Sequence, residues 1–324
     1  MVDSEAQPLE ASASNAVCES WQSAIQGVLA FVMFLGAVAM VQFYGPFAKQ
    51  SAPEEDLQKE VHQLTAELDQ LKQEQAMPAT VLSRYRNSIG YIYGVYDVGF
   101  ANQRPAIRAR ASGTAFLVGN GLLATNRHIA EPWYGDTESE SMIERGAVGS
   151  RETLVVFFPG SPTPVNLSVA AVSKNSDLAI LRVQDLEAVR GLTILPLAKS
   201  SSTPGERVTV VGYPMGIAGM VAKSPSGIYD RLAYRHNDIS AASELAALSL
   251  IRPSATWGHL GDVVGDKLIY DATTAHGGSG GPVFNSAGEV IGVNSAFMDG
   301  FSGGTIGISI EALHPLLEQA QKAR

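Results

Sequence analysis

A serine within a glycine-rich segment is the residue of this chain whose setting most suggests chemistry. Ser279 lies in AHGGSGGPVFN, residues 275–285, with two glycines on each side. A serine hydroxyl is a weak nucleophile at neutral pH. It becomes reactive when a histidine takes its proton and a carboxylate orients that histidine. The chain must therefore supply a histidine and an acid in an order that a fold can bring together.

The Gly-x-Ser-x-Gly pattern at residues 277–281 also fits a nucleophile elbow. In an elbow the serine lies between a strand and a helix, and the acid and the histidine follow it along the chain. Downstream of Ser279, the aspartate and the histidine available are Asp299 and His314. Pro282 and a hairpin pattern, PVF-NSAG-EVIGVNSAF, stand where the elbow needs a helix. We therefore reject the elbow.

The opposite order, histidine then aspartate then serine, is available upstream. His128 follows a predicted strand that ends in ATN, and Asp177 stands at the start of the apolar strand LAILRV. Both lie at strand ends, where a barrel can bring distant residues together. We predict that His128 is the general base, that Asp177 orients it, and that Ser279 is the nucleophile.

Other residues offer alternative bases and acids. His276 is closer to Ser279 along the chain, but neighbours in an extended segment rarely point the same way. Asp136 and Asp185 are the alternative acids, and both lie in predicted loops. The histidines without a supporting motif are His62, His236, His259 and His314.

Residues 88–324 contain many short β-branched and aromatic segments, separated by Gly, Pro, Asn and Asp. This pattern of short strands and turn residues predicts an all-β sandwich or barrel. Two helices are expected within it, at Ile239–Ile251 and Glu311–Lys322. The segment Ala218–Trp257 is unusually long and helical for a connection between strands. A lid, a specificity loop, an oligomer contact and a surface decoration all remain open for it.

Five segments in this region resemble, in the same order, the protease domain of disulfide-free bacterial trypsin-like serine peptidases of the HtrA/Deg type. They are GTAFLVGNGLLATNRHIA, SDLAILRV, PGERVTVVGYPMG, GGSGGPVFNSAGEVIGVNSA and GISI, which together span most of residues 112–310. The resemblance implies two six-stranded β-barrels of the trypsin-like fold, with the active site in the cleft between them. It also implies the catalytic roles predicted for the histidine, the aspartate and the serine.

The resemblance assigns further roles near the serine. The backbone N–H groups of Gly277 and Ser279 would form an oxyanion hole, whose donors are each worth roughly 3–4 kcal/mol to the transition state. Gly278 stands where the family often has Asn or Asp. Because it lacks that side chain, we expect no activation by a freed N-terminus. The glycine also leaves open whether the oxyanion loop is mobile, with a regulated inactive state, or already active at rest.

The strand Asn294-Ser295-Ala296 would line the main specificity pocket and pair with the substrate backbone. Thr273 would lie near the base of that pocket. Because none of these positions holds an Asp or a Glu, we expect cleavage after a small or medium apolar residue rather than after Lys or Arg.

The N-terminal region has a different character. Residues 1–20 are polar and acidic and are expected to be a disordered tail. Residues 21–46 contain the uncharged apolar segment Ala24–Tyr44, which is long enough for a transmembrane helix. A buried core helix and a cleaved signal peptide fit less well, since there is no polar face and no positive region before the apolar segment.

Residues 53–77 carry a short heptad seam at Leu57, Val61, Leu64, Leu68 and Leu71. This spacing predicts a coiled coil, and thus a homo-oligomer, with Met77-Pro78 ending the helix. A single amphipathic helix resting on the catalytic domain is the alternative.

The composition excludes several classes of protein. The net charge is −9, there is one cysteine, Cys18, and no block is rich in Lys or Arg. An intramolecular disulfide and a cysteine-based zinc site are therefore impossible, and a nucleic-acid partner is not expected. We expect no metal and no cofactor, and polypeptides as substrates.

Two indications of the side of the membrane disagree. The resemblance implies a single-pass protein of the bacterial inner membrane with a periplasmic protease domain. Residues 1–23 contain no Lys or Arg, whereas Lys49 and Lys59 follow the apolar segment. By the positive-inside rule these charges would place the protease domain in the cytoplasm. We favour the periplasmic, extracytoplasmic side.

The sequence thus predicts a membrane-anchored serine endopeptidase of protein quality control or regulated proteolysis. The alternative is a catalytically silent scaffold or chaperone that keeps the barrels to bind peptides. HtrA-type chains usually carry PDZ domains after the protease domain. One short helix follows the last predicted strand here, so we expect no PDZ domain.

Overall fold

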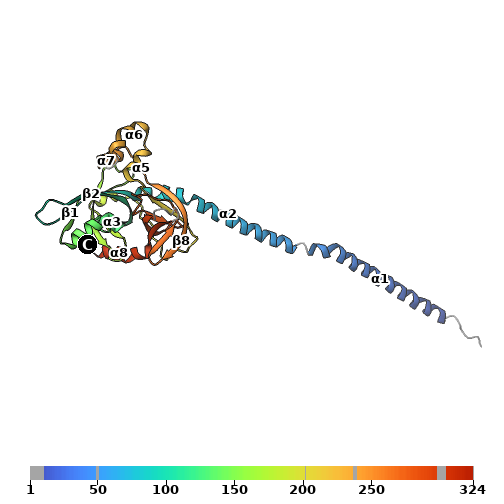
Figure 1. Ribbon diagram of the computed structural model, residues 1–324. Coiled ribbons are helices and arrows are strands. Elements are labelled where there is room, and N and C mark those ends of the chain that lie inside the picture. Colours follow the sequence, from blue (N-terminus) through green and yellow to red (C-terminus); the bar gives the residue numbers. More distant parts are fainter. Residues whose placement is uncertain (1–10, 49–50, 201, 236–238, 298–303, 324) are drawn as a thin grey trace, which may run out of the picture. The chain divides into compact units, whose positions relative to one another are not determined.

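The computed structural model describes residues 11–48, 51–200, 202–235, 239–297 and 304–323. The chain divides into two units, Met1–Leu71 and Lys72–Arg324. The first holds helix α1 (Ala11–Ala48) and most of helix α2 (Ser51–Tyr85). The second holds the end of α2 and all of the strands (Figure 1).

Helix α1 contains the predicted apolar segment. Residues Ile25–Phe43 have a mean hydropathy of 2.0, none of them is buried, and the segment is long and apolar enough to cross a membrane. The helix begins at Ala11, so it covers half of the predicted disordered tail; residues 1–10 lie outside the described residues. Alanines at 11, 13 and 16 favour helix, and they can extend an apolar helix that is already formed.

Helix α2 carries the predicted heptad seam. Its five seam residues are each 51–60 % exposed. We predicted that the helix ends at Met77-Pro78, but it continues to Tyr85. Val81 and Tyr85 are buried in the main core, and the ring of Tyr85 stacks on Phe284 at 5.8 Å. This burial offsets the backbone hydrogen bond that proline removes, which the sequence pattern alone could not reveal.

The first barrel has six antiparallel strands in the closed order β1-β2-β3-β6-β5-β4. Its inward-facing residues, among them Ile92, Leu123 and Val156, are fully buried. The strands are β1 (Ile89–Gly99), β2 (Ile107–Gly119), β3 (Leu122–Thr125), β4 (Val148–Phe157), β5 (Val165–Val172) and β6 (Ala179–Val183).

The second barrel is closed in the order β10-β11-β12-β9-β8-β7. The two barrels confirm the predicted all-β architecture. The strands are β7 (Arg207–Gly212), β8 (Ser254–Val264), β9 (Lys267–Tyr270), β10 (Pro282–Phe284), β11 (Val290–Phe297) and β12 (Thr305–Ser309).

Short helices connect the strands, and α8 follows the second barrel. Helix α8 was predicted at Glu311–Lys322 and spans Ile310–Lys322, with Ser309 accepting a hydrogen bond from the N–H of Glu311 as its cap. The others are η1 (Arg86–Ser88), α3 (Arg127–Ala130), α4 (Thr137–Glu144), η2 (Leu186–Val189), α5 (Gly216–Ala222), α6 (Ser226–Leu232), η3 (Ala233–Arg235) and α7 (Ile239–Ala247).

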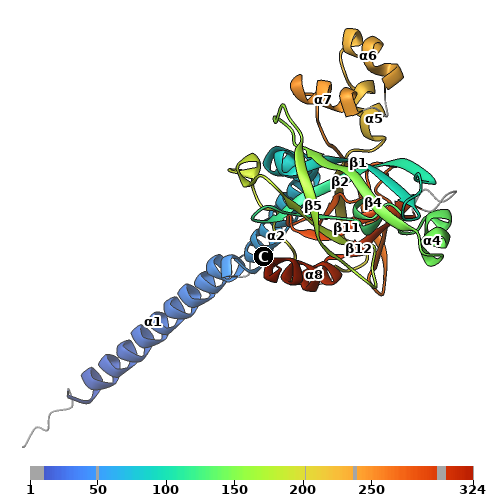
Figure 2. The same ribbon diagram turned by 90° about the vertical axis from the view of Figure 1, so that its left-hand side faces the viewer.

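The long connection between β7 and β8 contains α5, α6 and α7. These helices gather beside β1 and β2, on the opposite side of the barrels from α8 (Figure 2). Ile217, Leu232 and Leu245 from the three helices are buried in the same core cluster as Tyr91 and Tyr213 of the barrels. The connection is therefore packed onto the barrels and is more than a surface decoration.

Candidate active site

The paired strands β3 and β6 bring His128 and Asp177 together. Thr125 at the end of β3 pairs with Ala179 at the start of β6. His128 lies in α3, directly after β3, and Asp177 precedes β6. The Nδ1 atom of His128 is 2.8 Å from Asp177 Oδ2, and the His128 backbone N–H donates to Asp177 Oδ1 at 3.0 Å. Both carboxylate oxygens therefore hold the same histidine.

Ser279 comes from the second barrel, in the turn before β10. Its hydroxyl donates to the backbone carbonyl of Ser295 at 2.8 Å, and the Ser295 hydroxyl donates to Asp177 Oδ2 at 2.7 Å. Ser295 thus connects the serine to the histidine–aspartate pair. Among the described residues, the Ser279 hydroxyl has no hydrogen bond with the His128 ring. In this structure the Ser279 hydroxyl is therefore engaged by Ser295 and not by His128.

Asp177 is held in its ionised form. Burial raises the pKa of this carboxyl, but the hydrogen bonds and charge of His128 and the hydrogen bond from Ser295 lower it more. The pKa of Asp177 therefore lies below the usual range of an aspartate. An ionised carboxylate can only accept hydrogen bonds, so the Nδ1 atom of His128 that faces it donates.

The backbone around Ser279 has its carbonyl groups turned toward protein donors. The carbonyl of His276 accepts the Met215 N–H at 2.6 Å, and that of Gly277 accepts the Thr114 hydroxyl at 2.8 Å. The carbonyl of Gly278 accepts the Asn294 side-chain amide at 2.9 Å. Three consecutive carbonyls are thereby fixed. The sequence left open whether this loop is mobile, and in the structure partners from elsewhere in the chain restrain its backbone.

The two N–H groups predicted for the oxyanion hole are left without acceptors. Within the described part of the chain, neither the Gly277 N–H nor the Ser279 N–H makes a hydrogen bond. Gly277 has φ +89°, and a Cβ there would lie 2.5 Å from the Tyr213 carbonyl oxygen. Only glycine fits this conformation and this space. Both donors are therefore unpaired among the described residues.

The prediction that Asn294 lines the specificity pocket is wrong. It is fully buried, it accepts from the Tyr270 hydroxyl at 2.7 Å, and its amide holds the Gly278 carbonyl. A polar side chain buried with its hydrogen bonds satisfied is structural, and alternation along β11 does not distinguish this role from pocket lining. Thr273 and Ala296 are exposed, as a binding surface requires, and Ser295 uses its hydroxyl on Asp177.

The alternative acids have local structural roles. Asp136 caps α4 by accepting from the Ser139 N–H at 2.9 Å, and Asp185 caps η2 by accepting from the Glu187 N–H at 3.0 Å. A side chain engaged at a helix N-terminus satisfies a backbone donor. The structure thus places Asp177, and not these two residues, against the ring of His128.

Thr114 of β2 is a site residue that sequence reasoning missed. Its N–H donates to the Ser279 carbonyl at 2.7 Å, and its hydroxyl accepts from the Tyr213 N–H while it donates to Gly277. It joins the first barrel to the serine turn. The only available signal was its place in the GTAF motif, because the contact spans 163 residues.

Two closed six-stranded antiparallel barrels, with histidine and aspartate from the first and serine from the second, define the architecture of trypsin-like proteins. The family model described as "Trypsin-like peptidase domain" matches residues 113–293. This chain belongs to the trypsin-like peptidase family.

Curated relatives are similar over the same region. A probable periplasmic serine endoprotease DegP-like of Rhizobium meliloti is 28 % identical over 63 % of this chain and 31 % of its own length. The mitochondrial serine protease HTRA2 of Drosophila pseudoobscura pseudoobscura is 27 % identical over 66 % of this chain and 40 % of its own length. A glutamyl endopeptidase of Staphylococcus epidermidis is 27 % identical over 66 % of this chain and 60 % of its own length. The chain therefore spans less than two thirds of the length of these relatives.

One solved structure in the comparison is a serine endoprotease from Yersinia pestis. It covers 75 % of this chain and 65 % of its own, at 17 % identity and a TM-score of 0.48.

Proposed function

We propose that this chain is a serine endopeptidase that hydrolyses peptide bonds through an acyl-enzyme. The observation that carries the proposal is the continuous set of contacts from Ser279 through Ser295 to Asp177 and His128, beside two unoccupied backbone N–H groups. Membership of the trypsin-like peptidase family supports the same activity.

The mechanism follows from these groups. Asp177 accepts the Nδ1–H of His128, so Nε2 takes the Ser279 proton as Oγ attacks the scissile carbonyl. The negative charge that develops on the substrate oxygen is stabilised by the N–H groups of Gly277 and Ser279. His128 then gives the proton to the leaving amine, and water repeats the sequence to release the acyl group.

A fluorophosphonate probe tests this proposal, because it reacts with a serine activated by a neighbouring base. We expect stoichiometric labelling of the wild-type protein and none of Ser279→Ala. Ser168→Ala, which removes an exposed hydroxyl on β5, should label like the wild type. Equal labelling of Ser279→Ala would refute the nucleophile. A folded wild type that stays unlabelled would favour the peptide-binding scaffold.

We propose further that α1 anchors the protein in a membrane as a single-pass helix. The apolar length of Ile25–Phe43, and the absence of any buried residue within it, support an anchor. By analogy with the relative described as periplasmic, the catalytic unit would lie on the periplasmic side of a bacterial inner membrane. In that place an endopeptidase would act in protein quality control or regulated proteolysis.

The heptad seam of α2 supports self-association through a coiled coil. Its exposed leucines would bury their apolar surface against a second copy of the helix. We expect Leu64→Gln with Leu68→Gln to reduce the mass of the detergent-solubilised protein, measured by light scattering, to that of one chain. Ala66→Gln with Asp69→Gln, on the face away from the seam, should leave the mass unchanged. An oligomer that survives the seam substitutions would contradict the proposal.

A further inference from the structure

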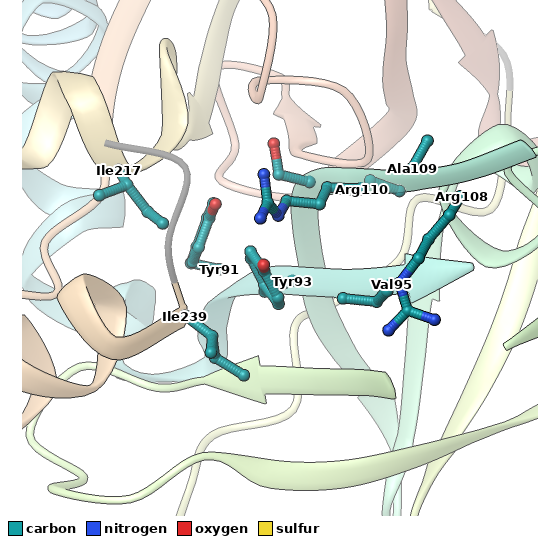
Figure 3. A pocket seen from close by; sticks show the side chains of 10 residues that line it. Tyr91, Tyr93, Val95, Arg108, Ala109, Arg110, Ile217 and Ile239 are labelled. Atoms are coloured by element: carbon teal, nitrogen blue, oxygen red, sulfur yellow. The ribbon is translucent and has the colours of Figure 1, made fainter. Parts of the chain in front are cut away.

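A pocket of about 480 Å³ lies beside the serine turn, between β1, β2 and the helical connection (Figure 3). Its walls are Tyr91 and Tyr93 from β1, residues 108–112 from β2, Ile217 from α5 and Ile239 from α7. The mechanism described above does not use it. Its mixed lining of tyrosine rings, aliphatic groups and arginines suits a ligand with both apolar and charged parts.

The pocket adjoins the site through two short connections. Ser112 is in its wall, and two residues further along β2 the N–H of Thr114 donates to the Ser279 carbonyl. On the other wall, Ile217 follows Gly216, whose backbone nitrogen would be 2.8 Å from a Cβ on Gly277. One wall of the pocket is therefore two residues along β2 from a residue that contacts Ser279. The other wall is next along the chain to Gly216, which lies beside Gly277.

We infer that the pocket lies on the leaving-group side, because the substrate segment before the scissile bond is expected to run along Ser295 and Ala296 of β11, whereas the pocket is lined by β1, β2, α5 and α7. Ser112 lies two residues and Arg110 four residues along β2 from Thr114, which contacts Ser279. Since an extended chain advances about 3.3 Å per residue, a substrate that runs along β2 from Ser279 would reach the pocket within two to four residues of the scissile bond.

Arg110 gives the pocket its charge. The two arginines of this wall differ: Arg108 forms ion pairs with Asp97, at 3.4 Å, and with Glu152, whereas Arg110 is exposed and has no acidic partner among the described residues. In Figure 3 the Arg110 side chain extends toward Tyr91, while Arg108 points away alongside Val95. The apolar groups of the pocket, among them buried Tyr91 and Ile217 and half-buried Ile239, lower the local dielectric, which strengthens the attraction of the guanidinium for an anion.

We propose that this pocket binds an acidic side chain of the polypeptide substrate, two or three residues after the scissile bond, through the guanidinium of Arg110. The proposal rests on the proposed endopeptidase function. A carboxylate is the natural partner because arginine binds it with two parallel N–H···O hydrogen bonds. The tyrosine and isoleucine walls would pack against the methylene groups of a Glu side chain.

Three fluorogenic peptides with one scissile sequence test the proposal. The first carries Glu at the second and third positions after the scissile bond, and the second carries Gln there; both are amidated at the C-terminus. The third is the Gln peptide shortened to end at the third position with a free C-terminal carboxylate. We expect wild-type kcat/KM to be about 10-fold higher for Glu than for Gln. A preference confined to the third peptide would mean that the pocket reads a chain terminus and would overturn the side-chain proposal.

Variants assign the preference to Arg110. Arg110→Gln should bring the Glu-to-Gln ratio of kcat/KM close to one, and Arg110→Glu should invert it. Arg108→Gln, on the same strand with its charge already paired, should keep the wild-type ratio. A ratio near one in the wild type, or a preference that survives Arg110→Gln, would overturn the proposal.

Failure of the pocket and failure of the proposed function give different results. Cleavage of the Gln peptide by the wild type but not by Ser279→Ala supports the function whatever the ratio is. If no peptide is cleaved, fluorescence anisotropy of the same peptides with Ser279→Ala measures binding directly. Tighter binding of the Glu peptide, lost on adding Arg110→Gln, would support the pocket alone, and equal binding would reject it.

Discussion

Replacing Ser279 or His128 by alanine is expected to lower kcat for peptide hydrolysis by about 10⁶-fold, and replacing both should lower it no further. The nucleophile and its base act as one unit, because the serine hydroxyl attacks only as the ring takes its proton. Without either member, the residual rate comes from binding and from the backbone N–H groups. Initial rates with a quenched fluorogenic peptide, at saturating concentration, give the three values.

Two matched substitutions control for general damage. His259→Ala removes an exposed histidine of the second barrel, and Ser168→Ala removes an exposed serine of the first. Both should keep kcat within about twofold of the wild type, because surface substitutions away from the site have small effects. A double variant much slower than either single variant would show that Ser279 and His128 do not act together, and would contradict the mechanism.

Asp177→Asn is expected to lower kcat by about 10⁴-fold. The carboxylate accepts from the His128 backbone N–H, from the ring and from the Ser295 hydroxyl. An asparagine has one acceptor oxygen, so its NH₂ group must face one of these donors. The ring would then be held in the wrong tautomer, with Nε2 protonated and unable to take the serine proton. Steady-state kinetics near neutral pH would measure the loss.

Asp185→Asn and Ser295→Ala separate this effect from others. The first alters an aspartate that caps η2 and should leave kcat near the wild-type value. The second removes one of the three donors to Asp177 but keeps its charge, so its effect should be much smaller than 10⁴-fold. If Asp185→Asn or Asp136→Asn proved as damaging as Asp177→Asn, the assignment of the acid would be wrong.

Local pattern was enough for the strand content and for α8, because both depend on neighbours along the chain. The predicted start of α8 lies within one residue of its observed start at Ile310, whereas β2 and β4 begin several residues before the segments that indicated them. The end of α2 was mispredicted at Pro78, since the burial of Val81 and Tyr85 depends on strands that lie much later in the sequence. The predicted disordered tail was likewise too long, because α1 begins at Ala11.

The same division holds in the site. The types and order of His128, Asp177 and Ser279 were readable from motifs at strand ends, and the structure brings their segments together. The sequence did not reveal the hydrogen bonds of Ser295 to Asp177 or of Thr114 to Gly277. It also predicted that Asn294 lines a pocket, whereas Asn294 is buried. Each of these three side chains bonds to a segment more than fifteen residues away, so no local pattern encodes the contact.

The sequence by itself therefore determined the family, the strand content, the candidate triad and the apolar N-terminal helix, all of which depend on residue type and short-range periodicity. The tertiary structure alone decided that the serine turn is held by its carbonyls, that its two N–H groups are free, and that the helical connection forms a pocket beside Arg110. These features arise where the two barrels and the connection between β7 and β8 meet. Hydrogen bonds and burial between distant segments are set by the closed packing of the chain, not by its local sequence.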